Sequence, residues 1–131
     1  MELVLIDTVY ARVTVNIDQK LGEIEWKGPC SLEQYQECFS VLLDYQSRNT
    51  VKYFLSDIRN QGIMNPNNRQ WFESVALPQA IRQGLLRSAV VSEDNIFKRY
   101  YVNLILHSTN KMGLPLRIFD SREQAIEWLF S

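Results

Sequence analysis

The chain has 131 residues, of which 46% are apolar and 22% are charged, and its formal net charge is −1. This length suits one hydrophobic core, so we expect a single domain over residues 1–131. The near-neutral charge excludes a global electrostatic attraction to nucleic acid or to an anionic membrane surface.

The cysteine and histidine content argues against metal sites and disulfide frameworks. Cys30 and Cys38 are the two cysteines, and His107 is the one histidine. Structural zinc and disulfide-rich folds need more of these residues at characteristic spacings. No apolar stretch approaches the roughly 20 residues that a membrane-spanning helix requires. We therefore expect a cytoplasmic protein with no metal, no cofactor and no stable membrane insertion.

The N-terminal part of the chain predicts strands. Residues 3–6 form a short apolar run, and apolar and polar side chains alternate over residues 11–17 and again over residues 22–27. Such alternation is typical of half-buried strands with one face in solvent. The polar turn at residues 18–20 joins the two longer runs, which indicates an antiparallel hairpin.

A helix is predicted to follow this hairpin. Ser31 and Gln34 have the spacing of a capping box, in which each side chain accepts a hydrogen bond from the other residue's backbone N–H. The apolar residues that recur at helical spacing after this box are Tyr35, Cys38, Phe39 and Leu42. They form one face of a helix that we expect to reach about residue 47.

The rest of the chain alternates strands with helices. The predicted strands cover residues 51–56, 85–92 and 116–119. The predicted helical segments cover residues 66–83, 96–111 and the stretch after Ser121. A hairpin followed by such alternating units indicates an α/β fold, in which an N-terminal antiparallel hairpin joins a mostly parallel sheet with about four helices.

Several residues mark the ends of these helices. Asn65 before Pro66 suits an N-cap followed by proline at the first helical position. Asp94 or Asn95 is a candidate cap for the helix at 96–111. Pro78 removes a backbone hydrogen bond and clashes inside a straight helix, so we expect a break near residues 76–77.

Two stretches resemble a known family. The sequence "GEIEWKGPCSLEQYQECFSVLLDY", followed by "VKYFLSDIRN", resembles the opening of the SpoIIAA-like (STAS) fold, in which a helix is followed by an apolar strand that ends in Asp. The tail "LPLRIFDSREQAIEWLF" resembles the end of SpoIIAA-like proteins of unknown function. The residues that match there are Phe119, Asp120, Ala125, Trp128 and Leu129. The resemblance implies a regulatory or binding domain, and a further likeness to CRAL-TRIO domains implies an apolar ligand as an alternative.

The chain departs from this family at its regulatory serine. Anti-anti-sigma members carry a phosphorylatable serine after the corresponding Asp, at a helix N-terminus that favours the added phosphate. Here residues 58–68 contain no serine, and Ser56 precedes Asp57. We therefore expect no phosphorylation switch in this loop.

Polar side chains that follow the predicted strands are the candidate binding residues. Asp57, Arg59 and Asn60 follow one strand, Ser92 follows the next, and Asp120 follows the last. Strand carboxyl ends collect ligands in open α/β sheets, and an arginine there is a forked donor for anions. The alternative is structural: Asp57 accepts loop amides, Arg59 is solvated, and the other residues cap helices.

Nucleophilic or acid–base chemistry has weaker support. His107 has no partner placed by sequence to act with it, and Cys38 has the position of a small core residue. Cys30 precedes a helix N-terminus, where a thiolate can be stabilised, but no base lies nearby in the sequence. We expect no catalytic residues.

The helix at 96–111 suggests association. We expect its core row to be Phe97, Tyr101, Leu104 and Ser108, with Ile105 beside it. Other apolar residues extend around most of the helix, and they are Ile96, Tyr100, Val102 and Leu106. A helix that is apolar nearly all round is covered on more than one side, so a homodimer through this helix is expected.

Three functions follow from these features. The leading one is a non-enzymatic binding or regulatory domain that acts through a protein partner or a small ligand at the strand carboxyl ends. The second is a carrier of an apolar or lipid-like ligand, held between the sheet and the helical segment around Trp71, with the part near Pro78 as a lid. The third is an enzyme of unknown type.

Overall fold

A six-stranded sheet organises the protein, in the order β1-β2-β3-β4-β5-β6. The computed structural model describes residues 1–62, 65–93 and 96–131, without the side chains of residues 96–98. The strands are β1 (Glu2–Asp7), β2 (Ala11–Asn16), β3 (Leu21–Trp26), β4 (Tyr53–Asp57), β5 (Arg87–Val91) and β6 (Leu116–Phe119). Strands β1 to β3 pair antiparallel and β3 to β6 pair parallel, which confirms the predicted fold class.

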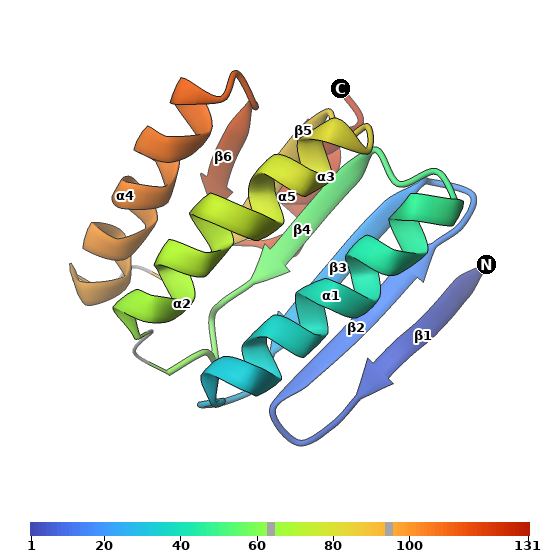
Figure 1. Cartoon of the computed structure of the whole chain (residues 1–131). Coiled ribbons are helices and arrows are strands. Elements are labelled where there is room, and N and C mark those ends of the chain that lie inside the picture. Colours follow the sequence, from blue (N-terminus) through green and yellow to red (C-terminus); the bar gives the residue numbers. More distant parts are fainter. Residues whose placement is uncertain (63–64, 94–95) are drawn as a thin grey trace.

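The helices lie on both faces of this sheet. They are α1 (Leu32–Arg48), α2 (Pro66–Trp71), the π-helical segment η1 (Phe72–Ala76), α3 (Leu77–Arg82), α4 (Ile96–Lys111) and α5 (Arg122–Leu129). Figure 1 shows α1, the continuous α2–η1–α3 segment and α4 in front of the sheet, and α5 behind it. Because α2, η1 and α3 follow one another without a gap, the described chain has four helical bodies, as expected.

Each face of the sheet has its own apolar cluster. The larger cluster joins the alternating residues of β2 and β3, such as Val13 and Ile24, to α1 and the α2–η1–α3 segment. The smaller cluster lies under α5 and consists of Leu21, Leu55, Ala89, Val91, Ala125 and Leu129. The central strands β4 and β5 contribute to both clusters. This explains why apolar residues do not alternate with polar ones along these strands.

The helix starts that we expected are present. The Ser31 hydroxyl accepts from the Gln34 N–H at 3.1 Å, and the Gln34 side chain accepts from the Ser31 N–H at 2.9 Å. The Asn65 side chain accepts from the Asn67 N–H at 2.8 Å, and the Ser121 hydroxyl accepts from Gln124 N–H at 3.2 Å. The candidate caps Asp94 and Asn95 lie outside the described residues.

The break expected near residues 76–77 is wrong. The chain stays helical through Pro78, and η1 absorbs the proline by widening the preceding turn. The Leu77 N–H bonds to the Phe72 carbonyl, which is the five-residue spacing of a π-helix. Such a wide turn is a known way for a helix to accommodate an interruption of its hydrogen-bond ladder. The helix ends at Arg82, and Gly84 follows with a φ of 112°, which only glycine adopts without strain.

The buried residues of α4 differ from the expected row at Tyr101, Leu104 and Ser108, whereas Ile105 is buried as expected and the side chain of Phe97 lies outside the described residues. Val102, Ile105 and Thr109 are buried, whereas Tyr101 and Leu104 are half-buried. Thr109 can occupy a core position because its hydroxyl donates to the Leu106 carbonyl at 3.0 Å. The spacing of apolar residues predicted a row of side chains next to the buried one. It missed Thr109, because a threonine whose hydroxyl bonds within its own helix can be buried like an apolar residue.

Candidate functional site

The exits of the parallel strands lie side by side at one edge of the sheet. Asp57 ends β4, and Ser92 and Asp120 directly follow β5 and β6. Two backbone hydrogen bonds tie these exits together: the Ile58 N–H donates to the Val91 carbonyl, and the Ser92 N–H donates to the Phe119 carbonyl, both at 2.9 Å. Three of the predicted binding residues are thus brought to the same edge.

Asp57 and Arg59 form a closed ion pair. The Arg59 Nε and Nη2 donate to the two carboxylate oxygens of Asp57 at 3.0 and 2.7 Å, and the Arg59 N–H adds a third bond at 3.1 Å. The Asp57 side chain is only 7% exposed, whereas that of Arg59 is 42% exposed. These hydrogen bonds raise the pKa of Arg59. Asp57 accepts a loop amide, as the structural interpretation expected, and it also holds the guanidinium that the other interpretation assigned to a ligand.

A hollow of about 360 Å³ lies between the exits of β5 and β6 and the starts of α4 and α5. We call it the edge hollow. Its lining residues are Ser92, Glu93, Arg99, Val102, Ile118, Phe119, Asp120 and Gln124. Two predicted residues, Ser92 and Asp120, therefore share one concave surface that offers both donors and acceptors. Arg99, Gln124 and Glu93 complete it, and sequence spacing gave no sign of their proximity.

Asn60 and Trp71 lie apart from the edge hollow. Asn60 is exposed in the loop after Arg59. Trp71 is half-buried on the face of the sheet that α1 covers. Its ring centroid lies 6.1 Å from that of Tyr35 and 6.0 Å from that of Phe39. Because it packs in this aromatic cluster, Trp71 is part of the helix-to-helix contact between α1 and α2.

The residues considered for catalysis are distributed over separate elements. His107 is exposed on α4. Cys38 is fully buried in α1, and burial raises its pKa to about 12. Burial also raises the pKa of Cys30, which is the opposite of the shift that an activated thiolate requires. Both free thiols are therefore held in their neutral form at neutral pH.

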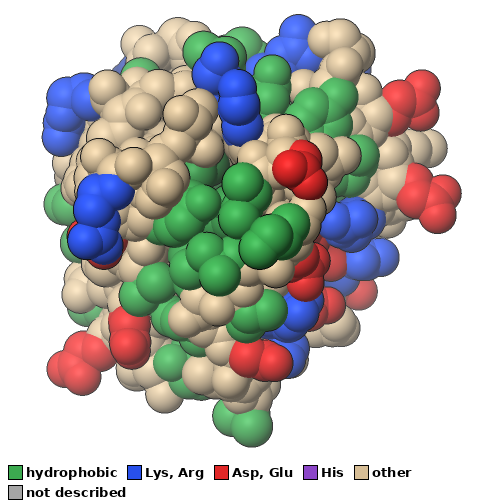
Figure 2. All heavy atoms as spheres, turned by 90° about the vertical axis from the view of Figure 1, so that its right-hand side faces the viewer, with side chains coloured by type: hydrophobic (Ala, Val, Ile, Leu, Met, Phe, Trp, Pro, Cys, Tyr) green, Lys and Arg blue, Asp and Glu red, His purple; other side chains and the backbone are tan. Residues whose placement is uncertain are grey.

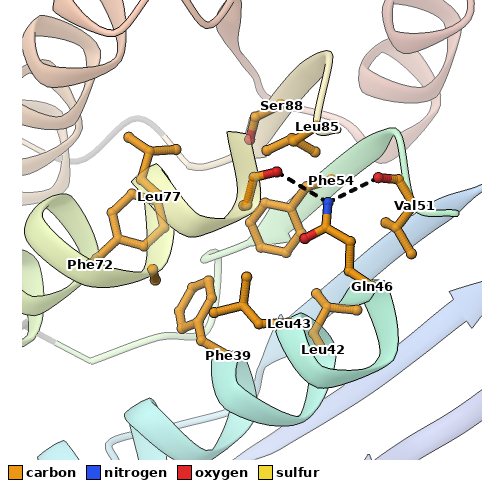
Figure 3. Close-up of a pocket in the computed structure, with 12 residues that line it drawn as sticks. Phe39, Leu42, Leu43, Gln46, Val51, Phe54, Phe72, Leu77, Leu85 and Ser88 are labelled. Atoms are coloured by element: carbon orange, nitrogen blue, oxygen red, sulfur yellow. Dashed lines mark hydrogen bonds between the residues drawn. The ribbon is translucent and has the colours of Figure 1, made fainter. Parts of the chain in front are cut away.

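Two small voids lie inside the larger cluster, and each has a volume of about 30 Å³. The inner void lies between α1, α3 and the sheet (Figure 3). The second, which we call the hydroxyl-lined void, extends toward α4 and the carboxyl ends of the strands. Residues that line both are Phe39, Phe54, Phe72 and Ser88. Ser88 was not predicted as a site residue, because its role depends on which face of β5 it occupies.

A half-buried ion pair borders the same region. Arg69 donates to both carboxylate oxygens of Glu73, at 3.1 and 3.3 Å, one helical turn apart on the α2–η1 segment. Tyr101 lies near both charges, and burial is the main cause of its raised pKa. Tyr35 is more deeply buried, and burial raises its pKa well above the usual value. The two phenols therefore remain neutral hydrogen-bonding groups.

An apolar patch marks the face that carries the N-terminal edge of the sheet (Figure 2). On β1, Val4 is 45% exposed, and Leu3, Leu5 and Ile6 are half-buried. The pairing of β1 with β2 shifts register between Val4 and Ile6. A bulge of this kind opposes pairing of an edge strand with another chain.

Metal sites and membrane spans were also sought in the described residues. No group of three His, Cys, Asp or Glu side chains gathers there as a metal ion would need. Within the same part of the chain, no helix combines the length and the apolar character needed to cross a membrane.

Comparison with known proteins identifies the fold. The structure resembles the crystal structure of an uncharacterised protein of the DUF3478 family, with a SpoIIAA-like fold, from Shewanella loihica PV-4. The TM-score is 0.65 at 13% sequence identity, over 95% of this chain and 97% of that one. No family model and no curated protein matches the sequence. The chain therefore has a SpoIIAA-like fold, as its sequence suggested.

Proposed function

We propose that this SpoIIAA-like chain is a non-enzymatic binding or regulatory domain that recognises a protein partner or a small ligand at the carboxyl edge of its sheet. The observation that carries the proposal is the edge hollow, in which Ser92, Asp120, Arg99 and Gln124 converge from separate elements. Concave surfaces with a few converging polar groups are the usual form of a binding site. Their place beyond the strand carboxyl ends is the one that α/β sheets favour.

The Asp57–Arg59 pair is assigned a supporting role. Each group satisfies the other, so the pair stabilises the β4 exit beside the edge hollow. Recognition is assigned to side chains with more freedom, above all the exposed Asp120 and Gln124. This division predicts that substitution at Asp57 affects stability, whereas substitution at Asp120 affects binding.

The test is quantitative affinity capture with a charge-reversal variant. Purified wild-type protein and Asp120→Lys are used as bait in the same cell extract, and the captured proteins and small molecules are compared by mass spectrometry. We expect a defined set of ligands to be lost from Asp120→Lys. The matched control is Asn49→Lys, in a second hollow of about 410 Å³ at the opposite end of the sheet.

Two outcomes would contradict the proposal. Either Asp120→Lys retains the ligands that bind wild-type protein, or Asn49→Lys loses them as completely as Asp120→Lys does. Circular dichroism checks that each variant is folded. We expect both to fold, because both positions are exposed and neither substitution should alter the core.

A homodimer through α4 is a separate proposal. Tyr100 on this helix is 70% exposed, and Leu104 is half-buried. Light scattering after gel filtration should then give twice the chain mass of 15.4 kDa, and Tyr100→Lys should return it to the single-chain value. A single-chain mass for the wild-type protein at micromolar concentration would reject the dimer.

A further inference from the structure

The basic side chains of the protein differ in whether a carboxylate holds them. Carboxylates lie within ion-pair distance of Arg12, Lys27, Arg48, Arg59, Arg69 and Arg122. In the part of the chain that the structure describes, five other basic side chains have no carboxylate at that distance, and they are Lys20, Lys52, Arg82, Lys111 and Arg117. We call them the unpaired cations. Because no internal carboxylate neutralises them, their charge remains available to an external anion.

The unpaired cations all lie at the amino edge of the sheet, which is the end where β3 to β6 begin (Figure 1). Lys20 directly precedes β3, and Lys52 directly precedes β4. The Lys52 N–H donates to the Lys20 carbonyl at 2.9 Å, which holds the two strand starts together. Arg82 and Lys111 end α3 and α4, and Arg117 is the second residue of β6.

Helix dipoles account for part of this arrangement. Arg82 and Lys111 lie in the last turns of their helices, where a cation is favourable beside the partial negative charge of the helix end. Lys20, Lys52 and Arg117 belong to no helix, so this explanation does not apply to them. The amino edge therefore carries more positive charge than the helix ends account for.

Carboxylates at the amino edge leave this charge largely uncompensated. Asp18, in the turn before β3, pairs with the amino group of Met1. Asp44 on α1 pairs with Arg48. Glu127, near the end of α5, is exposed and opposes the unpaired cations with a single charge. The edge thus has a local positive potential, although the net charge of the whole chain is −1.

Large apolar side chains are exposed among these cations. Leu86, which directly precedes β5, is 52% exposed, and Phe130, which directly follows α5, is 39% exposed. Met1, Ile17 and Met112 are also exposed at this edge. Cations beside protruding apolar groups are the combination with which proteins lie on anionic membranes, because the cations attract headgroups and the apolar groups enter the boundary of the acyl chains.

Aromatic rings at this edge are already engaged within the protein. The guanidinium carbons of Arg87 and Arg117 lie 5.2 and 5.7 Å from the ring centroid of Trp128. The ring of Tyr53 packs edge-on against that of Phe130, with 4.9 Å between the centroids. Single-stranded nucleic acid is bound by open aromatic faces on which bases stack. The edge therefore suits an anionic lipid surface better than a nucleic acid.

We propose that the amino edge of the sheet docks on the surface of an anionic lipid bilayer. The unpaired cations contact the headgroups, and Leu86, Phe130 and Met112 enter the interfacial layer. The contact is peripheral and is weakened by salt, because it depends on exposed charges. The edge hollow lies at the opposite end of the strands, so it stays open when the protein is docked. The proposal does not rest on the function proposed for that hollow.

Co-sedimentation of the full chain with vesicles tests the proposal. One set of vesicles consists of phosphatidylcholine, and the other contains about 30% phosphatidylserine as the anionic lipid. We expect the protein to bind the phosphatidylserine vesicles and not those of phosphatidylcholine alone. Raising the salt from about 0.1 M to about 1 M should release it, because the Debye length falls from about 10 Å to about 3 Å.

A charge variant locates the contact. Arg82→Gln/Lys111→Gln removes two exposed cations and should weaken binding to phosphatidylserine vesicles by about 25-fold, at about fivefold for each cation. The control Asn67→Asp/Gln70→Glu changes the net charge equally, at exposed positions of α2 outside the amino edge. The control should bind as the wild type does, because net charge alone does not set the attraction.

An apolar variant tests whether side chains enter the lipid. Leu86→Ser should weaken binding by about threefold to tenfold, because less apolar area leaves water on docking. The matched control is Val9→Ser, since Val9 is 92% exposed in the turn between β1 and β2, at the opposite edge. Val9→Ser should not change binding. Circular dichroism checks that each variant is folded, as expected for substitutions at exposed positions.

Several results would overturn the inference. Wild-type protein that binds neither set of vesicles, or both equally, would do so. Equal binding of the two charge variants, or of Leu86→Ser and Val9→Ser, would do so as well. Polyglutamate serves as a second probe, which carries negative charge without lipid. Protein that binds polyglutamate but no vesicles would assign the amino edge to an acidic polypeptide instead.

Discussion

Single residues of this protein have roles that follow from what their side chains touch. Gly22 in β3 is the clearest case, because a Cβ there would lie 2.9 Å from Leu42 Cδ1 and 3.1 Å from Leu42 Cδ2. The missing side chain lets α1 pack closely against the sheet. Gly28, by contrast, has nothing within 4 Å of its missing Cβ.

These two glycines give a matched pair of substitutions. Gly22→Ala should lower the free energy of unfolding by about 1–3 kcal/mol, because the added Cβ would push the Leu42 methyl groups within the packed core. Gly28→Ala should have little effect or stabilise slightly, because it reduces the conformational entropy of the unfolded chain. Urea unfolding measures both. Equal effects of the two substitutions would show that the contact with Leu42 has no consequence.

Buried thiol and phenol groups predict a loss of stability at alkaline pH. Burial raises the pKa of Cys38 from 9.0 to about 12, so the folded state retains a proton that the unfolded state releases. The resulting stability is fully present below pH 9 and is lost as the pH rises through about 12. Tyr35 and Tyr101 act in the same direction at higher pH, since their pKa values are also raised.

Urea unfolding at about pH 8 and at about pH 11 tests whether stability falls as the pH rises. Wild-type protein should be less stable at the higher pH, and Cys38→Ala should lose less stability between the two values, although the substitution lowers stability at both. If Cys38→Ala shows the same pH dependence as the wild type, the buried thiol is not a source of the effect.

Local sequence signals determine where the helices of this protein begin. The capping box of α1, the Asn65 cap of α2 and the Ser121 cap of α5 were all recognisable from short patterns. Their effect is local, because each satisfies backbone N–H groups within one turn. The middle of the α2–η1–α3 segment was harder to predict, since whether Pro78 breaks or widens a helix depends on the packing of both halves.

The cap of α1 can be tested with a control on the same helix. Ser31→Ala should lower the free energy of unfolding by about 0.5–2 kcal/mol, because it leaves the Gln34 N–H without its partner. Ser40→Ala, at an exposed position inside α1, should be neutral or slightly stabilising. Thermal and urea unfolding compare the two. A neutral Ser31→Ala would mean that water replaces the cap at no cost.

The whole molecule is built from two apolar layers that share one sheet. Trp26 and Trp71 report on the larger cluster, and Trp128 packs beside the smaller one under α5. Because β4 and β5 contribute side chains to both layers, loosening one face should destabilise the other. We therefore expect both layers to unfold in a single cooperative transition.

A substitution under α5 tests this coupling. Leu129 is 1% exposed. Leu129→Ala should lower the free energy of unfolding by about 2–5 kcal/mol. In a Trp128→Phe background, the fluorescence of Trp26 and Trp71 should show the same shift in midpoint as circular dichroism. Glu127→Ala, at an exposed position of α5, is the control. An unmoved fluorescence midpoint would show that the two layers unfold independently.

The sequence alone determined the order of elements, the class of fold and its SpoIIAA-like character. Periodicity, caps and turn residues carry that information because each acts within a few residues of the chain. Boundaries shifted by one to two residues in places: Val51 and Ser92, for example, lie just outside β4 and β5. Asp57, Ser92 and Asp120 could also be assigned to one edge, because parallel strands bring their carboxyl ends together.

Only the tertiary structure decided what those residues face. Asp57 pairs with Arg59, and Trp71 packs against α1. Ser92 and Asp120 line the edge hollow together with Arg99 and Gln124. The tertiary structure also brought Ser88 between two voids. These placements depend on the rotation of helices and on the register of strands far apart in the chain. Local sequence patterns do not encode them, because they arise from how whole elements pack.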